Sequence, residues 1–326
     1  MDKLILIDEE INDFDKISQK NEHITNLQLI NCKLNTIKKL PNNLKKMIVR
    51  NSELEIIDKS CIPESLIYID LNDNIIKNLE FITENIIYLS LAQNCICSVK
   101  CNKNNLIELY LDDNMIRTLD EFPYMPQLNL LSIGKNGISN IDILEEKTPN
   151  LTKLNISECD ISKINKLPSR LVLFIAENNE IKKILCNFPF NLEILNLKNN
   201  KIKDEYPDIP QSVKYLDMSN NNLKRYDYFH IGVKYIDIRN NKKLYLNKLQ
   251  IDIINDIVNY GCEVYYDNNN HNNHNNHNNH NNHHNNHHNH NNNHNHNNSK
   301  NNSDKIIKKK GIETDYELNF THVVKC

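Results

Sequence analysis

The chain of 326 residues contains no tryptophan and only 5 glycines. The glycines stand at positions 134, 137, 232, 261 and 311, a spacing that builds neither a phosphate-binding loop nor a dinucleotide-binding fingerprint. Outside one histidine-rich tract the only histidines are His23, His230 and His322, and none lies beside a cysteine or serine as a nucleophile and its base would. These absences predict a protein that is not an enzyme and holds no cofactor.

Long apolar runs and paired cysteines are missing as well. Residues 1–10 hold only four consecutive apolar positions before an acidic run, too few for a signal-peptide core or a membrane span. The cysteine count, 9, is odd, and no closely spaced cysteine pairs cap the chain, so we expect reduced thiols. With 39 basic and 42 acidic residues, the charge gives no argument for binding nucleic acid or a membrane. The sequence therefore predicts an intracellular, cytoplasmic protein.

What the chain does contain is the pattern LxxLxLxxNxIxxL, repeated eleven times between residues 24 and 246 at intervals of 20 to 23 residues. A period this short and regular predicts a stacked solenoid. Positions are counted from the first residue of each copy, and positions +3 and +5 alternate as in a short strand with one buried face. Neighbouring copies are expected to pair these strands in parallel. The copies begin at Ile24, Leu44, Leu66, Ile86, Leu106, Leu128, Leu151, Leu171, Leu192, Val213 and Val233.

Position +8 is asparagine in eight of the copies. An inward asparagine at the turn after a strand can both donate and accept hydrogen bonds, so we expect these amides to link successive coils into a ladder. Cys32, Ser52 and Cys159 occupy the same position in the other three copies. The ladder asparagines are Asn74, Asn94, Asn114, Asn136, Asn179, Asn200, Asn221 and Asn241.

These repeats resemble leucine-rich repeats, over roughly residues 24–260. Several copies open with a Leu-Pro phrase, such as Leu40-Pro-Asn-Asn-Leu44, and so resemble the short repeats of bacterial effector proteins mixed with the intracellular type. The resemblance implies a horseshoe with a parallel sheet on its concave face. Proline in the short return stretch disfavours a long helix there, so extended or 3₁₀ segments are expected on the convex side. The abundant asparagine, isoleucine and lysine are similar to the usage of AT-rich genomes, such as those of social amoebae or giant viruses of amoebae.

Five segments follow from this pattern. Residues 1–23 are predicted to form an N-terminal cap, and residues 24–246 the eleven repeats. Residues 247–267 are predicted to form a C-terminal cap, with a helix whose apolar face includes Leu249 and Ile253 and a closing strand after Gly261. Residues 268–302, almost wholly asparagine and histidine, are predicted to be disordered, and residues 303–326 form a short tail.

The histidine tract has two interpretations. Neutral imidazoles bind zinc, copper or nickel, which would make the tract a metal-capturing segment. Repeat expansion explains the same composition, and weak, adventitious metal binding is then expected without being the function. Cys95, Cys97 and Cys101 form a CxCxxxC cluster, but flanking coils offer no fourth zinc ligand, so we predict surface thiols and no metal site.

The concave face carries the candidate binding residues, because positions +2, +4 and +6 point away from the buried +3 and +5 side chains. An apolar and aromatic run with a charged rim is typical of a binding hot spot, although tyrosines also stack across strands simply to stabilise a sheet. The first candidate patch is Leu173, Ile175, Ile194, Tyr215, Asp217, Tyr235, Asp237 and Arg239. The second, whose acidic surplus favours a basic partner, is Tyr68, Asp70, Asp73, Tyr88, Glu108, Tyr110, Asp112 and Asp113.

From these features we predict a non-enzymatic scaffold that binds a protein or peptide partner on its concave face. Two alternatives stay open. The chain could act as a metal-binding or stress-related protein through its histidine tract, or as an adaptor for a phosphatase or a ubiquitin ligase complex, the latter by analogy of fold alone.

Overall fold

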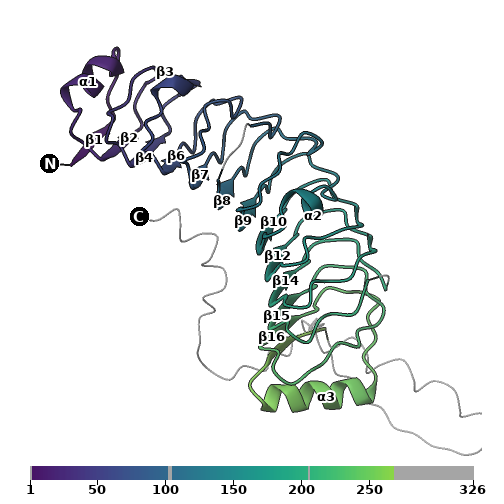
Figure 1. Ribbon diagram of the computed structural model, residues 1–326. Coiled ribbons are helices and arrows are strands. Elements are labelled where there is room, and N and C mark those ends of the chain that lie inside the picture. Colours follow the sequence, from purple (N-terminus) through teal and green to yellow (C-terminus); the bar gives the residue numbers. More distant parts are fainter. Residues whose placement is uncertain (1, 102–104, 205, 268–326) are drawn as a thin grey trace, which may run out of the picture.

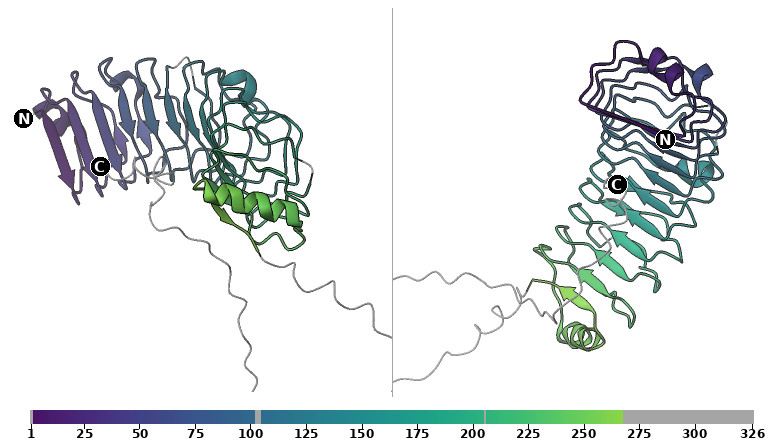
Figure 2. Two further views of the ribbon diagram at one scale, coloured as in Figure 1. Left: turned by 90° about the horizontal axis from the view of Figure 1, so that it is seen from below. Right: turned by 90° about the vertical axis from the view of Figure 1, so that its left-hand side faces the viewer.

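The computed structural model describes residues 2–101, 105–204 and 206–267. These residues form a curved solenoid whose sheet lines the inner side of the arc (Figure 1). Two further views show the strands stacked side by side with the return segments on the outer side (Figure 2). The predicted fold class, a repeat solenoid with a concave parallel sheet, is confirmed. The asparagine and histidine tract at 268–302 and the tail at 303–326 lie outside the described residues.

One parallel sheet of 13 strands runs the length of the arc. Neighbouring strands pair in a constant register, so that position +2 of one copy lies beside position +2 of the next, as Tyr215 lies beside Tyr235. Each repeat position therefore forms a column across the sheet. The strands in order are β1 (Lys3–Ile7), β2 (Asn26–Ile30), β4 (Lys46–Arg50), β6 (Tyr68–Asp70), β7 (Tyr88–Ser90), β8 (Glu108–Tyr110), β9 (Leu130–Ser132), β10 (Lys153–Asn155), β12 (Leu173–Ile175), β14 (Ile194–Asn196), β15 (Tyr215–Asp217), β16 (Tyr235–Asp237) and β17 (Glu263–Tyr265).

The core is a stack of identical layers, one for each coil. In the fifth copy, the leucines at 106, 109 and 111 and the isoleucine at 116 have no exposed surface. Full burial of one such side chain contributes about 1.5–3 kcal/mol. Because every copy supplies the same apolar positions, the layers form one continuous core from Ile11 to Val264.

The return segments are short and mostly irregular, as the proline phrases predict. Two small parallel pairs form there, β3 (Thr36–Ile37) with β5 (Ile56–Ile57) and β11 (Lys163–Ile164) with β13 (Lys183–Ile184). A 3₁₀ turn, η1 (Lys59–Cys61), and a single-turn helix, α2 (Leu144–Lys147), complete this side. Helix α2 lies in the longest interval between two copies, where the extra residues leave room for one helical turn.

A left-handed residue at position +7 ends every repeat strand. All eleven of these residues have φ between 48° and 59°, and eight of them are asparagine or aspartate, the residues that best tolerate this conformation after glycine. The turn aims the +8 side chain into the coil. The +7 residues are Asn31, Asn51, Asp73, Gln93, Asp113, Lys135, Glu158, Asn178, Asn199, Asn220 and Asn240.

The inward asparagines hydrogen-bond to two coils at once. Asn136 Nδ2 donates to the carbonyl of Leu111 in the preceding coil at 3.0 Å and to the carbonyls of Ile133 and Gly134 in its own coil, also at 3.0 Å. Its Oδ1 accepts the N–H of Ile116 at 3.0 Å. These are backbone groups that the turns would otherwise leave buried without partners. At the same position the Cys159 thiol makes a longer contact, from Sγ to the Ile133 carbonyl at 3.5 Å.

Both ends of the solenoid are covered. Helix α1 (Phe14–Lys20) packs Phe14 against the first coil, and helix α3 (Lys248–Asn259) buries Ile254 and Ile257 against the last. The expectation that Leu249 belongs to the inner face of this helix is wrong, since 68% of its surface is exposed. Gln250 lies inward instead, because its Nε2 donates to the Tyr226 carbonyl at 2.7 Å and so satisfies a buried backbone group.

Candidate functional site

Three tyrosines form a column on the concave face at the C-terminal end. The rings of Tyr215 and Tyr235 are stacked, with centroids 4.4 Å apart and planes 5° apart, and the Tyr265 ring follows at 5.4 Å and 42°. The Arg239 guanidinium lies over Tyr265, 4.8 Å from the ring centroid. We call Tyr215, Tyr235 and Tyr265 the C-terminal tyrosine column. Tyr265, on strand β17, is not among the predicted site residues, although its pairing with Asp237 could have been found by extending the repeat register into the closing strand.

The predicted charged rim of this patch does not match the structure. Asp217 and Asp237 are only 5% and 2% exposed, because both carboxylates bend back onto the turn that follows their own strand. Asp217 Oδ1 accepts from the N–H and the hydroxyl of Ser219, at 2.9 and 2.7 Å, while burial raises the pKa of Asp217. Asp237 Oδ1 accepts from Arg239 Nε at 3.0 Å, and this contact is the main cause of the raised pKa of Arg239. Both carboxylates are therefore buried, and that of Asp237 is also paired with Arg239.

The apolar part of the same patch is only partly exposed. Leu173 is 4% exposed, whereas Ile175 and Ile194 are half-buried on the concave surface next to the tyrosines. Strands β12 and β14 place Leu173 beside Ile194 in the sheet. The accessible surface of the first patch consequently consists of the two isoleucines, Tyr215, Tyr235 and Arg239, whose side chain is 38% exposed.

A second group, the N-terminal tyrosine column, consists of Tyr68, Tyr88 and Tyr110. The first two rings are stacked at 4.1 Å and 3°, and Tyr110 follows Tyr88 at 5.5 Å. Lys46 Nζ lies 4.3 Å from the centroid of Tyr68. Burial raises the pKa of Tyr88 and of Tyr110, and the Tyr110 hydroxyl donates to Glu108 at 3.0 Å, so both phenols stay protonated at neutral pH.

The acidic surplus beside this column is distributed differently from the prediction. Asp70 is fully buried and accepts from Arg50 Nε at 3.1 Å, so its charge is neutralised within the protein. Asp73 and Asp113 are exposed in the turns after their strands, and burial raises the pKa of Asp73. Asp112 lies farther along the sheet and faces a hollow.

This central hollow, of about 450 Å³, lies on the concave face between the two tyrosine columns. Its side walls include Tyr88 and Tyr110 from the N-terminal column. No sequence prediction named it as a whole, although the second patch contains four of its residues. The signal in the sequence is a group of small residues at positions +4 and +6 of the fourth, sixth and seventh copies. These small residues are Ser90, Ala92, Ser132, Gly134 and Ser157.

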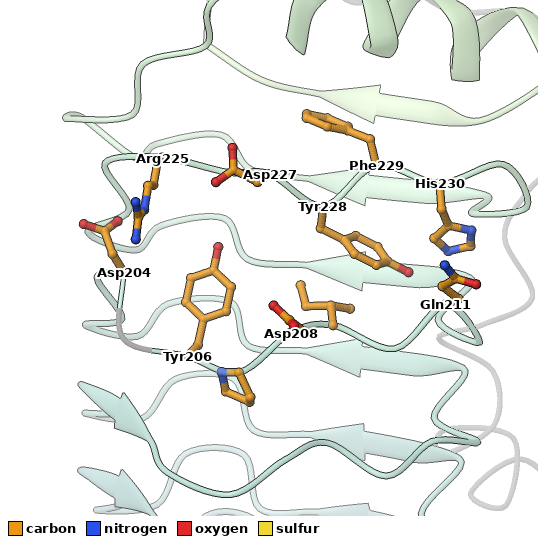
Figure 3. Close-up of a pocket in the computed structure, with 11 residues that line it drawn as sticks. Asp204, Tyr206, Asp208, Gln211, Arg225, Asp227, Tyr228, Phe229 and His230 are labelled. Atoms are coloured by element: carbon orange, nitrogen blue, oxygen red, sulfur yellow. The ribbon is translucent and has the colours of Figure 1, made fainter.

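Another hollow, of about 330 Å³, lies among the return segments of the ninth and tenth copies (Figure 3). Tyr206, Asp227 and Tyr228 line it, and the figure shows Arg225 close to Asp204 at one end. At the other end the Tyr228 hydroxyl donates to the Pro210 carbonyl at 2.9 Å, so this phenol is already engaged. Nothing in the sequence indicated this hollow.

Within the described ranges, no group of three or more histidine, cysteine, aspartate or glutamate side chains is arranged to hold a metal ion. The same residues include no helix with the length and apolar character needed to cross a membrane. Of the cysteine cluster, Cys97 is exposed, Cys95 and Cys101 are half-buried, and the intervening Ile96 is fully buried.

Thiol burial predicts a large difference in chemical reactivity. Burial raises the pKa of Cys159 to about 11 and that of Cys262 to about 12, so both stay protonated and unreactive at neutral pH. We expect iodoacetamide at pH 7.5 to modify exposed Cys97 at least tenfold faster than either of them, as measured by peptide mass spectrometry. Denaturant should make the three rates similar. Equal rates in the native protein would show that the buried positions are accessible.

The stacked coils, the inward asparagines and the concave parallel sheet together define a leucine-rich-repeat fold. The leucine-rich repeats of FLRT2, in an octameric complex with latrophilin 3 and Unc5D, align with a TM-score of 0.59 and 20% identity, over 80% of this chain and 82% of that one. The leucine-rich repeat domain of APL1B aligns with a TM-score of 0.58 and 18% identity, over 69% and 70%. YopM, a leucine-rich effector protein from Yersinia pestis, aligns with a TM-score of 0.53 and 22% identity, over 69% and 68%.

At these identities the likeness concerns the fold. No protein-family model matches the sequence, and no curated protein sequence matches it.

Proposed function

We propose that this protein is a non-enzymatic scaffold that binds a protein or peptide partner on the concave face of its sheet. The observation that carries the proposal is the C-terminal tyrosine column together with half-buried Ile175 and Ile194. Tyrosine rings give large, rigid and amphipathic contact area at a low entropic penalty, which is why they dominate many binding hot spots.

The surface is preorganised in two ways. The constant strand register fixes the spacing of the rings, since Tyr215 pairs directly with Tyr235. The asparagine bonds between coils, such as those of Asn221 to Leu197 at 2.9 Å and Asn241 to Met218 at 3.0 Å, hold neighbouring strands at that spacing. A partner that docks here orders few additional groups, which favours affinity.

The fold supports the same proposal. The repeats of FLRT2, which are similar in fold, occur in a complex with two other proteins. Stacked tyrosines also stabilise a sheet by themselves, by about 0.5–1.5 kcal/mol for each pair. Partner binding and stability therefore have to be measured separately.

The test compares two double variants of the full chain in the cells that naturally express it. Tyr215→Ala with Tyr235→Ala removes two rings of the column, whereas Tyr245→Ala with Tyr260→Ala removes two exposed rings, 59% and 75% accessible, that lie outside the column. Proximity labelling should identify a partner whose enrichment falls at least tenfold in the first variant and stays unchanged in the second. Circular dichroism and thermal unfolding check that both variants fold.

The same partner list from the folded column variant would contradict binding at this column. It would move the interaction to the N-terminal tyrosine column or away from the concave face.

A further inference from the structure

The central hollow is a built feature of four consecutive coils, β7 to β10. Positions +4 and +6 carry large side chains such as Arg50 and Ile175 in other coils, but in these four coils five of the eight are serine, alanine or glycine. The other three are Tyr110, Asp112 and Asn155. A Cβ at Gly134 would lie 3.0 Å from Asp112 Oδ1 and 3.0 Å from the Ser157 carbonyl oxygen. A side chain at Gly134 would therefore press on Asp112 and on the backbone of Ser157, and it would fill part of the hollow.

Asp112 offers one carboxylate oxygen to the hollow. Its Oδ1 accepts from the Ser132 hydroxyl at 2.7 Å, the Gly134 N–H at 2.9 Å and Asn155 Nδ2 at 3.3 Å. Its Oδ2 accepts no hydrogen bond from any described residue, although Asp112 lines the hollow. Burial is the main cause of the raised pKa of Asp112. A desolvated carboxylate with one unused oxygen gains most from a cation brought by a ligand.

The remaining charges around the hollow are mostly negative. Asp113, Glu158 and Glu177 line its edge, against a single cation, Lys135. Asn196 Nδ2 donates to Glu177 at 3.0 Å, which holds that carboxylate beside the hollow without neutralising it. A positively charged group entering here meets a complementary field.

The tyrosine wall is also suited to a cation. Both tyrosine columns already hold one of the protein's own cations against a ring, Lys46 over Tyr68 at 4.3 Å and Arg239 over Tyr265 at 4.8 Å. Tyr88 and Tyr110 have no such cation among the described residues, and both line the hollow. Cation–π contacts of this kind contribute about 0.5–2 kcal/mol, more where the pair is desolvated.

We propose that the central hollow receives an arginine or lysine side chain of a bound peptide, whose cation pairs with Asp112 Oδ2 and lies against the wall formed by Tyr88 and Tyr110. This rests on the proposed function, because the peptide backbone has to lie along the concave sheet to place the side chain there. The partner is thus a protein segment with a basic residue flanked by residues that contact the tyrosine columns.

The probe is a fluorescein-labelled peptide, Gly-Tyr-Gly-Arg-Gly-Tyr-Gly, paired with the same peptide carrying citrulline, which keeps the shape of arginine without its charge. Fluorescence polarisation measures both against the full chain in low-salt buffer. We expect the arginine peptide to bind at least tenfold more tightly than the citrulline peptide. Asp112→Asn, which preserves the acceptor for Ser132 and Gly134, should reduce this preference to threefold or less. Asp120→Asn, a charge-matched change at an exposed position, should leave it unchanged.

Three results would overturn the proposal: no measurable binding of the arginine peptide, equal binding of the two peptides, or an arginine preference that survives Asp112→Asn. Because Asp112→Asn is nearly isosteric, thermal unfolding should show that it folds. The double variant Glu158→Gln with Glu177→Gln leaves the floor of the hollow unchanged and should also weaken the preference for the arginine peptide, because it removes two negative charges from the edge. The cellular partner separates the two hypotheses. A partner that is lost with the Tyr215 and Tyr235 variant but kept by Asp112→Asn supports concave binding and excludes the basic side chain in the hollow.

Discussion

Replacing Asn136 by alanine is expected to lower the free energy of unfolding by about 3 kcal/mol or more. The change removes four hydrogen bonds, three from Nδ2 to the carbonyls of Leu111, Ile133 and Gly134 and one to Oδ1 from the Ile116 N–H. All lie inside the solenoid, where each unsatisfied polar group is destabilising by about 1–3 kcal/mol. Urea unfolding followed by circular dichroism measures the loss.

The control for this prediction is Asn222→Ala. Asn222 is exposed at position +9 and its side chain makes no hydrogen bond to a described residue, so its removal should change stability by less than about 0.5 kcal/mol. Each coil contacts only its neighbours, so a break at the central Asn136 should also make unfolding less cooperative. Similar stabilities for the two variants would mean that the asparagine bonds between coils contribute little.

Two neighbouring tyrosines are expected to respond to phenylalanine in opposite directions. Tyr226 is fully buried and its hydroxyl has no hydrogen-bond partner among the described residues, so Tyr226→Phe should raise the free energy of unfolding by about 1–2 kcal/mol. The Tyr228 hydroxyl donates to the Pro210 carbonyl at 2.9 Å, so Tyr228→Phe should lower it by about 1 kcal/mol. Both variants keep their ring contacts, including that of Tyr226 with Phe229 at 5.1 Å.

Each change removes a single oxygen from adjacent rings, so the difference between them isolates the hydrogen bond. Parallel urea titrations of the two variants and the parent protein give the three free energies. A loss of stability in Tyr226→Phe would show that its hydroxyl has a partner, such as a bound water molecule.

The fold could be predicted because a repeat states its pattern many times. One apolar strand pair such as Leu109 and Leu111 is weak information, but the same spacing in eleven copies leaves only a stacked solenoid. Position +8 could be interpreted for the same reason, since an amide is the side chain that both donates and accepts at a turn. The left-handed conformation at position +7, as at Asn199, is not among the sequence predictions, although asparagine is frequent at this position.

The site was predicted less well, because alternation gives the direction of a side chain and not its depth. Asp217 does point away from the core, but it is only 5% exposed, and its Oδ1 accepts from the N–H of Ser219. The central hollow depends on the sizes of side chains from four coils together. Gly134 contributes to it because it has no side chain to fill the space, and this effect cannot be predicted from one repeat alone.

The claim that a partner binds the concave sheet is tested most directly by site-specific photocrosslinking in the native cell. A benzoylphenylalanine at Ile194 lies on the concave face next to Tyr215, whereas the same group at Leu185, 61% exposed, lies in a return segment. We expect one protein to crosslink from position 194 and not from position 185, and to disappear with Tyr235→Ala. A crosslinked protein that appears only from position 185 would contradict concave binding.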